Sequence, residues 1–361
     1  MSTISEHSTP LLHVDEKHML RSIQIAKNGL GFTAPNPMVG CVIVHEGNII
    51  GEGFTSPYGG SHAEVNAINA IADVSKLEKS TLYVTLEPCS HFGKTPPCAD
   101  FIIKHKIPKV VIGLKDPHKK VAGKGIEKLK NAGCTVKVGV AKEACREHHK
   151  RFLTYQIKKR PFIILKWAET QDGFIAPEHN QRNENPEPYW ITNPFSRQLV
   201  HQWRSEEQGI LAGTNTILAD NPKLDVRDWT GKSPVRIVLD AKGKLSKKFH
   251  VMDGSQPTMV FTSLENPKGD MDGIEYRTID YKKDMAFQIC EELYRSNMQS
   301  IIIEGGAQTL QTFIDAGLWD EARIFKGPSI FKNGVGAPKI SGSTVYSRYI
   351  REDQLTVLKN D

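Results

Sequence analysis

The stretch LEPCSHFGKTPPC, Leu86 to Cys98, places two cysteines at the ends of a polar loop that contains glycine and proline. Two thiols in this arrangement can form a disulfide, a redox pair or half of a metal site. The whole chain has 6 cysteines among 361 residues, which is sparse for a disulfide scaffold. We therefore expect a reduced, cytoplasmic setting, in which a cysteine pair more often serves a metal or catalysis.

The composition is that of a soluble globular protein, with 39% hydrophobic and 24% charged residues. No apolar run is long enough to predict a membrane span, and the N-terminus lacks the pattern of a signal peptide. The net charge of +6 is modest and compatible with anionic small-molecule substrates. The densest basic run, HHKRFLTYQIKKR at His148–Arg160, is typical of a solvated connector, with a nucleic-acid contact as the alternative.

The chain divides into two α/β halves without an internal repeat, and we expect domains at residues 1–150 and 151–361. In the first half, Asp15 is expected to cap a helix that runs through Asn28 and is closed by Gly29. Strands then alternate with helices, which predicts a mixed sheet covered by helices on both faces. The expected strands are 40–44, 49–51, 81–87, 109–114 and 135–138, and the expected further helices are 62–72, 99–106 and 124–132.

The second half is expected to contain strands at 161–168, 209–213, 235–240, 258–262 and 300–306 and helices at 194–205, 285–296 and 309–316. No G-x-G-x-x-G motif follows these strands, so a classical dinucleotide fold is not indicated. The strand that reaches Glu304 instead leads through Gly305 and Gly306 toward a helix, whose N-terminus can hold a phosphate. Taken alone, such a turn is more often a packing feature.

A histidine supplies a third partner for the two cysteines. A catalytic zinc needs three protein ligands and an open position, and His62, Cys89 and Cys98 offer one nitrogen and two sulfurs. Glu64 need not ligate and can carry a proton for water at the open position. The order of these residues matches the zinc-deaminase signature, except that eight residues rather than two separate the cysteines.

Three other interpretations keep the zinc. A structural zinc would need a fourth ligand, for which His91 is the nearest candidate, but it leaves Glu64 without a function. A zinc-stabilised binding module would make Glu64 dispensable and would unfold when the metal is removed. A nucleic-acid base deaminase with an added domain is the enzymatic alternative, although such enzymes use the short cysteine spacing.

Three segments closely resemble the family of bifunctional riboflavin-biosynthesis deaminase/reductases. They are PNPMVGCVIV (Pro35–Val44), HAEV (His62–Val65) and EPCSHFGKTPPC (Glu87–Cys98), whose long spacer matches the family pattern S-H-x-G-[KR]-T-P-P. The resemblance implies a cytidine-deaminase-like, three-layer α/β/α domain in which Glu64 is catalytic. The substrate contacts that it implies are Asn36, His91 and Lys94.

Two further positions of this half are compared with the family. Asp116–Pro117 resembles a family segment, as either a turn or a site. Thr55 stands where the family commonly has histidine, which puts one substrate contact in doubt.

The second half resembles the reductase domain of the same family in LKWAETQDG (Leu165–Gly173), WIT (Trp190–Thr192), GTNTILADNPKLDVR (Gly213–Arg227) and EGG (Glu304–Gly306). This resemblance implies a dihydrofolate-reductase-like α/β domain that uses NADPH. The implied cofactor contacts are Trp190, Thr216, Asp220, Gly306, Ala307, Gln308, Thr309, Leu310, Gln311 and Thr312. The implied substrate contacts are Lys166, Arg204, Leu224, Arg227 and Glu304.

The resemblance covers nearly the whole chain and implies two consecutive reactions. A diaminopyrimidinone that carries a ribosylamino 5′-phosphate loses an amino group by hydrolysis, and hydride transfer then converts its ribosyl group to ribityl. The implied partners are this small phosphorylated pyrimidine and further copies of the chain, as a dimer or tetramer, with neither nucleic acid nor membrane. Glu169, Pro188 and Ala241 depart from the family, so an inactive reductase half is a second alternative.

Overall fold

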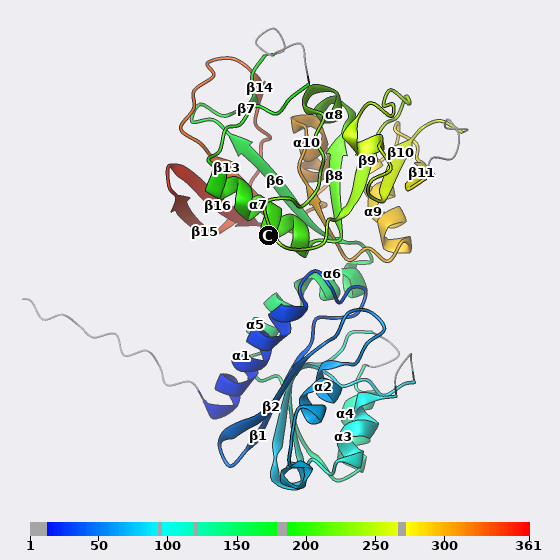
Figure 1. Cartoon of the computed structure of the whole chain (residues 1–361), viewed down its shortest axis with the longest axis vertical. Helices are drawn as coiled ribbons and strands as arrows, with labels where there is room; N and C mark the ends of the chain where they lie inside the picture. Colours follow the sequence, from blue (N-terminus) through cyan, green and yellow to red (C-terminus); the bar gives the residue numbers. More distant parts are fainter. Residues whose placement is uncertain (1–12, 93–95, 119–121, 179–185, 266–271) are drawn as a thin grey trace, which may run out of the picture. The chain divides into compact units, whose positions relative to one another are not determined.

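The computed structural model describes residues 13–92, 96–118, 122–178, 186–265 and 272–361. The chain divides into two compact units between Ile157 and Lys158, and each unit has its own sheet and its own hydrophobic core (Figure 1). Helix α6 (Lys150–Lys158) begins at the expected domain boundary and ends at the division between the two units. In the described part of the chain, we find no helix with the length and apolar character needed to span a membrane.

The first unit is built on a five-stranded mixed sheet with the order β2-β1-β3-β4-β5. Strand β1 pairs antiparallel with β2 and β3, whereas β3, β4 and β5 run parallel. The strands are β1 (Gly40–His45), β2 (Asn48–Phe54), β3 (Thr81–Leu86), β4 (Lys109–Leu114) and β5 (Thr135–Val138). Nearly every residue of β1, β3 and β4 is buried, as expected for strands covered on both faces.

Helices cover both faces of this sheet and complete a three-layer α/β/α unit. Helices α1 and α5 pack together over β1, β3 and β4, while α2, α3 and α4 form the opposite layer (Figure 1). The α-helices are α1 (Val14–Ala26), α2 (Ala63–Asn69), α3 (Cys98–Lys104), α4 (Lys124–Asn131) and α5 (Lys142–His148), with 3₁₀ helices η1 (Lys27–Gly29) and η2 (Val74–Lys79). The expected fold class of this half is confirmed.

Two sequence-based expectations for this unit need correction. The residue that caps α1 is His13, whose Nδ1 accepts the Asp15 N–H at 3.2 Å. Asp15 lies inside the first turn instead, because its carboxylate accepts hydrogen bonds from Tyr83 and Lys137. Most of the basic run is helical rather than a solvated connector, and it buries the side chains of Phe152 and Tyr155.

The second unit contains a nine-stranded sheet with the order β11-β10-β9-β8-β12-β6-β13-β16-β15. All neighbours from β11 to β13 are parallel, and β16 and β15 add an antiparallel hairpin at one edge. The strands are β6 (Phe162–Glu169), β8 (Gly209–Gly213), β9 (Val235–Leu239), β10 (Thr258–Thr262), β11 (Ile274–Thr278), β12 (Ser300–Ile303), β13 (Glu321–Lys326), β15 (Ser343–Ile350) and β16 (Asp353–Lys359). Strands β7 (Phe174–Ala176) and β14 (Val335–Gly336) pair separately.

Two apolar clusters lie on opposite faces of the large sheet, because successive side chains of a strand point to opposite sides. Along β6, for example, Leu165 belongs to one cluster and Ile164 to the other. Helices α9 and α10 contribute to the first cluster, and α7 and α8 contribute to the second. Their bounds are α7 (Pro194–Glu206), α8 (Thr214–Asp220), α9 (Met285–Arg295) and α10 (Ala307–Asp315), with a 3₁₀ helix η4 (His250–Met252).

Candidate active sites

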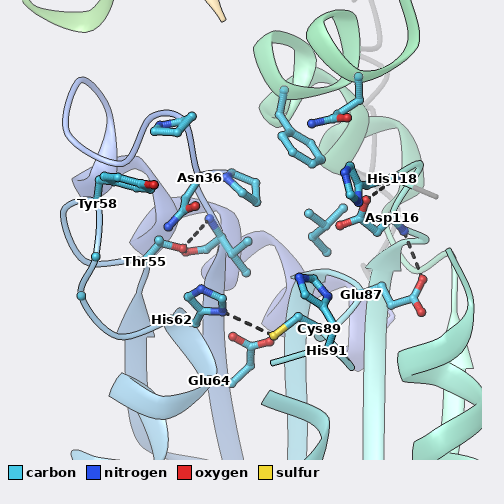
Figure 2. Close-up of a pocket in the computed structure, with 18 residues that line it drawn as sticks. Asn36, Thr55, Tyr58, His62, Glu64, Glu87, Cys89, His91, Asp116 and His118 are labelled. Carbon is cyan, nitrogen blue, oxygen red and sulfur yellow. Dashed lines mark hydrogen bonds between the residues drawn. The ribbon is translucent and has the colours of Figure 1, made fainter. Parts of the chain in front are cut away.

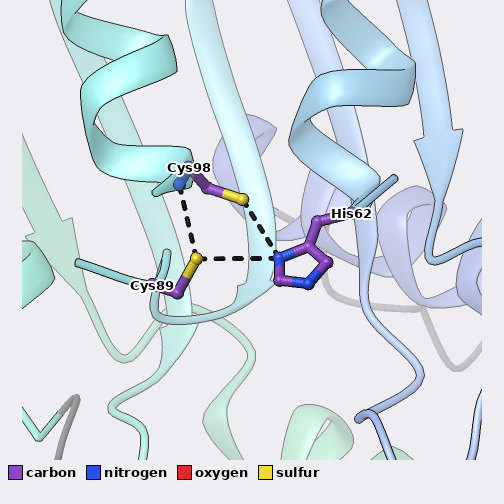
Figure 3. Close-up of side chains that lie close together, drawn as sticks. All are labelled: His62, Cys89 and Cys98. Carbon is purple, nitrogen blue, oxygen red and sulfur yellow. Dashed lines mark hydrogen bonds between the residues drawn. The ribbon is translucent and has the colours of Figure 1, made fainter. Parts of the chain in front are cut away.

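Three elements bring the predicted metal ligands together. His62 immediately precedes α2, Cys89 follows β3, and Cys98 is the first residue of α3. Their ligand atoms all lie within 4.8 Å of one another (Figure 3). Nδ1 of His62 is 3.2 Å from Sγ of Cys98 and 3.6 Å from Sγ of Cys89. All six cysteines are free thiols, so the pair is part of a metal-type cluster and not a disulfide.

The two thiols lie in contact and shift each other's pKa in opposite directions. A hydrogen bond from the Cys98 thiol lowers the pKa of Cys89 to about 4, and the same contact raises the pKa of Cys98 well above its ordinary value. The backbone N–H of Cys98 also donates to Sγ of Cys89, at 3.3 Å. Two cysteine sulfurs and an imidazole nitrogen at this spacing form a donor set that fits zinc.

Glu64 lies in the first turn of α2 and is only 3% exposed. Burial raises the pKa of its carboxyl group to about 7. The side chain borders the same cavity as His62 and Cys89 (Figure 2). A carboxyl group that titrates near neutrality beside a metal site can accept a proton and return it.

These groups lie at the bottom of a cavity of about 350 Å³ in the first unit (Figure 2). Its walls come from the loop before β1, the loop between β2 and α2, the segment after β4, and the side chains of Phe152 and Gln156 on α6. Two of the predicted substrate contacts, Asn36 and His91, border this cavity, and Lys94 lies outside the described residues. The cavity is therefore closed at one end by the metal cluster and lined by polar groups elsewhere.

Thr55, which replaces a histidine of the family pattern, joins two walls of the cavity. Its hydroxyl oxygen accepts the Val39 N–H at 3.1 Å, and its own backbone N–H donates to the Val39 carbonyl at 3.0 Å. The residue is 3% exposed and borders the cavity. It therefore fastens the loop after β2 to the loop that carries Asn36.

The sequence analysis did not assign several residues that the structure places at this cavity. Asp116 is buried, and burial raises the pKa of its carboxyl group to about 6. Its Oδ1 accepts the backbone N–H of His118 at 2.7 Å, and both side chains border the cavity. Tyr58 borders the cavity as well (Figure 2). The only sequence signal for this group was the Asp116–Pro117 segment.

In the second unit, three of the predicted substrate contacts form a buried charged cluster. The guanidinium of Arg204 on α7 makes two hydrogen bonds of 2.8 Å to the Glu304 carboxylate, which follows β12. Nζ of Lys166 on β6 lies 3.6 Å from the same carboxylate. Burial alone would raise the pKa of Glu304, but Arg204 and Lys166 outweigh it and lower this pKa to about 2.

The other two predicted substrate contacts lie in the loop after α8. Arg204 donates to the Asp225 carbonyl at 3.0 Å, and the Asp225 carboxylate accepts a 2.6 Å hydrogen bond from Arg227. Arg227 is therefore linked to the charged cluster through Asp225. Leu224 has a positive φ of 51°, and its side chain packs in the core. This packing holds the loop that carries Arg227 against the second unit's core.

The predicted phosphate segment lies beside α8. A Cβ atom on Gly306 would lie 3.1 Å from Oγ1 of Thr216, and one on Gly213 would lie 2.5 Å from Oγ1 of Thr309. Gly306 also has a positive φ of 65° and precedes the first residue of α10. Glycine is thus required where the two helix starts approach each other.

The remaining predicted cofactor residues have different environments. Asp220 is the last residue of α8, Ala307 and Gln308 start α10, and the Thr312 hydroxyl donates to the Gln308 carbonyl. Leu310 is buried in the core. The Gln311 side chain donates to the Lys339 carbonyl and accepts the Lys339 N–H.

Trp190, the last of the predicted cofactor residues, is 52% exposed, with the Arg197 guanidinium 4.6 Å from its ring centre.

Two of the departures from the family pattern have defined partners. Glu169 accepts a 2.9 Å hydrogen bond from the Trp167 indole, and the backbone carbonyl of Ala241 accepts one from the Ser263 hydroxyl. Pro188 lies on the exposed segment before Trp190. Glu169 and Ala241 thus have local structural partners.

Comparison with protein families defines the class of both units. Residues 12–114 match the model described as the cytidine and deoxycytidylate deaminase zinc-binding region. Residues 161–353 match the model of the RibD C-terminal domain. The chain therefore joins a zinc-binding deaminase region to a reductase region.

Relatives with the same two parts identify the family. The riboflavin biosynthesis protein RibD of Aquifex aeolicus is 39% identical over 327 residues, which cover 89% of each chain. The protein of that name from Bacillus amyloliquefaciens is 37% identical and covers 91% of this chain and 88% of its own. The crystal structure of a diaminohydroxyphosphoribosylaminopyrimidine deaminase/5-amino-6-(5-phosphoribosylamino)uracil reductase from Thermotoga maritima matches with a TM-score of 0.88 and 37% identity, over 97% of this chain and 99% of its own.

This chain belongs to the RibD family of bifunctional riboflavin-biosynthesis deaminase/reductases. It is an enzyme with a zinc-binding deaminase part and a reductase part, and its cofactors are zinc and NADPH. The resemblance drawn from the motifs is confirmed, and the alternatives of a nucleic-acid deaminase and an inactive reductase half are not favoured.

Proposed function

We propose that the enzyme deaminates 2,5-diamino-6-(5-phosphoribosylamino)pyrimidin-4(3H)-one and then reduces the ribosyl group, giving 5-amino-6-(5-phosphoribitylamino)uracil. Residues 1–150 carry the first reaction and residues 151–361 carry the second. The observation that supports this most is the convergence of His62, Cys89 and Cys98 with a buried carboxyl group, Glu64, in one cavity. The substrate class is that of the solved relative from Thermotoga maritima, a diaminohydroxyphosphoribosylaminopyrimidine deaminase/5-amino-6-(5-phosphoribosylamino)uracil reductase.

In the deamination, His62, Cys89 and Cys98 would hold zinc, which would supply a nucleophilic water at neutral pH. Glu64 would accept a proton at its carboxylate and return it to the departing amino group. Glu64 is buried, and its pKa of about 7 suits a group that must both accept and donate a proton near neutral pH.

Asn36, His91 and Lys94 orient the substrate over this centre. The amide of Asn36 can both donate to and accept from a pyrimidinone edge. Asn36 and His91 border the cavity, which places their side chains on the walls that a substrate would meet. Lys94 contributes positive charge for the phosphate, on the strength of the family pattern in the spacer.

In the reduction, bound NADPH would supply the hydride. The cofactor contacts are those named from the sequence, with Trp190, Thr216 and Asp220 toward the nicotinamide and residues 306–312 around the phosphates. The glycine-lined approach of Thr216 to Gly306 supports this assignment. Lys166, Arg204, Leu224, Arg227 and Glu304 hold the substrate. Arg204 and Lys166 keep Glu304 ionised. The Glu304 carboxylate can therefore accept hydrogen bonds from the substrate, and Arg204 and Lys166 can donate them.

The enzyme works in the cytoplasm on this small phosphorylated pyrimidine, without nucleic acid or membrane, and as a homo-oligomer of two or four chains. The sparse free cysteines support the reducing compartment.

A two-step assay on the purified enzyme tests the proposal. The diaminopyrimidinone ribosyl phosphate should release ammonia first, and added NADPH should then be oxidised only after that release. Oxidation of NADPH before any ammonia is released would show that the two steps occur in the reverse order. Absence of ammonia release from folded, zinc-loaded enzyme would remove this substrate from the first reaction.

A further inference from the structure

A second buried carboxylate lies beside the metal cluster and takes no direct part in the proposed deamination. Glu87 directly follows β3, two residues before Cys89, and is 4% exposed. Its carboxylate accepts four backbone N–H groups. Oε2 accepts those of Asp116 at 3.2 Å and Gly123 at 2.9 Å, and Oε1 accepts those of Gly125 at 3.0 Å and Ile126 at 3.3 Å.

These four N–H groups belong to the segment after β4 and to the start of α4. Gly125 and Ile126 are in the first turn of α4, where N–H groups have no partner inside the helix. A carboxylate at this end of a helix is also favoured by the helix dipole. Glu87 therefore caps α4 from another element, and both of its oxygens are used for that purpose.

The same segment contacts the backbone next to Cys89 directly. A Cβ atom on Gly125 would lie 2.0 Å from the carbonyl oxygen of Pro88, so only glycine fits there. Backbone atoms cannot give way as a flexible side chain can. The start of α4 is thus pressed against Pro88 while Glu87 holds it by hydrogen bonds.

The held segment carries part of the cavity wall. Asp116 and His118 both border the cavity, and the Asp116 N–H is itself one of the four groups bound by Glu87. The hydrogen bond from the His118 N–H to Asp116 then fixes the second residue relative to the first. A change at Glu87 would move this wall relative to Cys89 without touching a ligand atom.

We propose that Glu87 is a positioning residue for deamination, which sets the wall of Asp116 and His118 at a fixed place relative to the metal ligands. The inference rests on the proposed deamination, whose substrate it uses. It predicts that loss of the carboxylate weakens substrate binding, with zinc retained.

The first test is Glu87→Gln in the full-length, zinc-loaded enzyme. Glutamine keeps the size of the side chain but turns an amide donor toward two backbone donors. We expect kcat/KM for ammonia release to fall on the order of tenfold or more, mainly through KM, since hydrogen bonds to a charged group are lost. Zinc content should stay at the wild-type level. Glu52→Gln is the matched control, because Glu52 pairs with Arg21 away from the cavity.

The second test needs no variant and so survives a folding failure of Glu87→Gln. Hydrogen exchange of the wild-type holoenzyme should show the amides of Asp116, Gly123, Gly125 and Ile126 protected to a similar degree as those of β3. Rapid exchange at all four amides would overturn the inference, as would an unchanged KM in a folded Glu87→Gln. If wild-type enzyme released no ammonia from this substrate, the proposed function would fail, while the exchange result would still decide whether Glu87 holds the four amides in the folded enzyme.

Discussion

At the scale of single residues, the deaminase part uses separate residues to bind the metal and to carry the proton. Glu64→Gln preserves the size of the side chain but removes its ability to accept a proton. We expect kcat for ammonia release to fall by about a hundredfold or more, the usual contribution of a positioned acid–base group. Zinc measured by atomic absorption should be unchanged.

Cys98→Ser provides the contrasting variant, because it should lose zinc as well as activity. Cys134→Ser is the matched control, since Cys134 donates to the Ile107 carbonyl and lies outside the metal cluster. Near-normal deamination by Glu64→Gln would contradict its role as proton carrier.

The reductase part has a corresponding dependence on one buried carboxylate. Glu304→Gln leaves Arg204 and Lys166 buried without a full counter-charge. Breaking one side of a buried ion pair costs about 3–5 kcal/mol, so unfolding of the second unit should shift to clearly lower denaturant. Reduction should be lost while ammonia release persists. Glu275→Gln removes an exposed pair with Arg277 and should change stability by about 1 kcal/mol or less. Equal loss of both activities in Glu304→Gln would contradict two separate sites.

The individual ligands could be predicted from the sequence, but the groups that hold them could not. His62, Cys89 and Cys98 each stand at a strand end or helix start that the local pattern marks, so their convergence follows from the topology. Glu87 binds only backbone N–H groups, which every residue type carries, and no pattern of side chains reveals such a partner. The link between Arg204 and Glu304 spans 100 residues and was accessible only through the family resemblance.

At the scale of elements, α5 is fastened to the cavity by two adjacent histidines. Nε2 of His148 donates to the Met38 carbonyl at 2.7 Å, and His149 pairs with the hydroxyl of Thr85 at 3.0 Å. Thr85 in turn accepts the Gly40 N–H at 3.2 Å. The loop that carries Asn36 is therefore held from α5 at both Met38 and Gly40.

The titration of His148 makes this contact dependent on pH. Burial, together with the charges of Lys27 and Arg151 and against the hydrogen bond to Met38, lowers the pKa of His148 to about 4. Burial also lowers the pKa of the neighbouring His149 well below its ordinary value. Unfolded histidine titrates near 6.5. Between these values the unfolded chain binds a proton that the folded chain does not, so the contribution of His148 is full above pH 6.5 and is lost as the pH falls toward 4.

A comparison with His148→Gln isolates this effect from the other titrating groups. Glutamine can donate to the Met38 carbonyl but does not titrate. Relative to wild type, the variant should therefore gain about 2 kcal/mol of stability when the pH is lowered from 7.5 to 5. Urea unfolding followed by far-UV circular dichroism at both pH values measures the difference. A stability difference that does not change with pH would show that the pKa of His148 in the folded enzyme is not lowered from its unfolded value.

Several elements of the second unit illustrate where sequence patterns stop. The buried parallel strands were expected from continuous apolar runs, and β8 and β10 agree with those expectations residue for residue. Strand β15 has no such signal, because nearly all of its side chains are exposed and polar and apolar residues do not alternate between a buried and an open face. Its partner β16 shows burial at every second residue, but the turn before it, Arg351–Glu352, contains none of the glycine or asparagine residues that mark a two-residue hairpin. Edge strands of this kind are fixed by pairing rather than by composition.

At the scale of the whole molecule, the two units can be observed separately in one sample. All five tryptophans, Trp167, Trp190, Trp203, Trp229 and Trp319, belong to the second unit. Tryptophan fluorescence therefore reports unfolding of the reductase part alone. Hydrogen exchange in β3 and β4 reports on the deaminase part, whose core contains both strands. Each unit has its own sheet and core, which is the condition for separate unfolding transitions.

Removal of zinc by a chelator should then act on one transition only. A ligand that binds the folded state stabilises it by about 2.7 kcal/mol at a concentration one hundred times its Kd, and its removal abolishes that contribution. Hydrogen-exchange protection of β3 and β4 should fall by a corresponding factor, whereas the denaturant midpoint from tryptophan fluorescence should stay unchanged. Glu304→Gln should give the reverse pattern, with a lower fluorescence midpoint and unchanged protection in β3. If chelation moved both transitions together, the two units would form one cooperative folding unit, and the metal would stabilise the reductase part as well as the cavity that it completes.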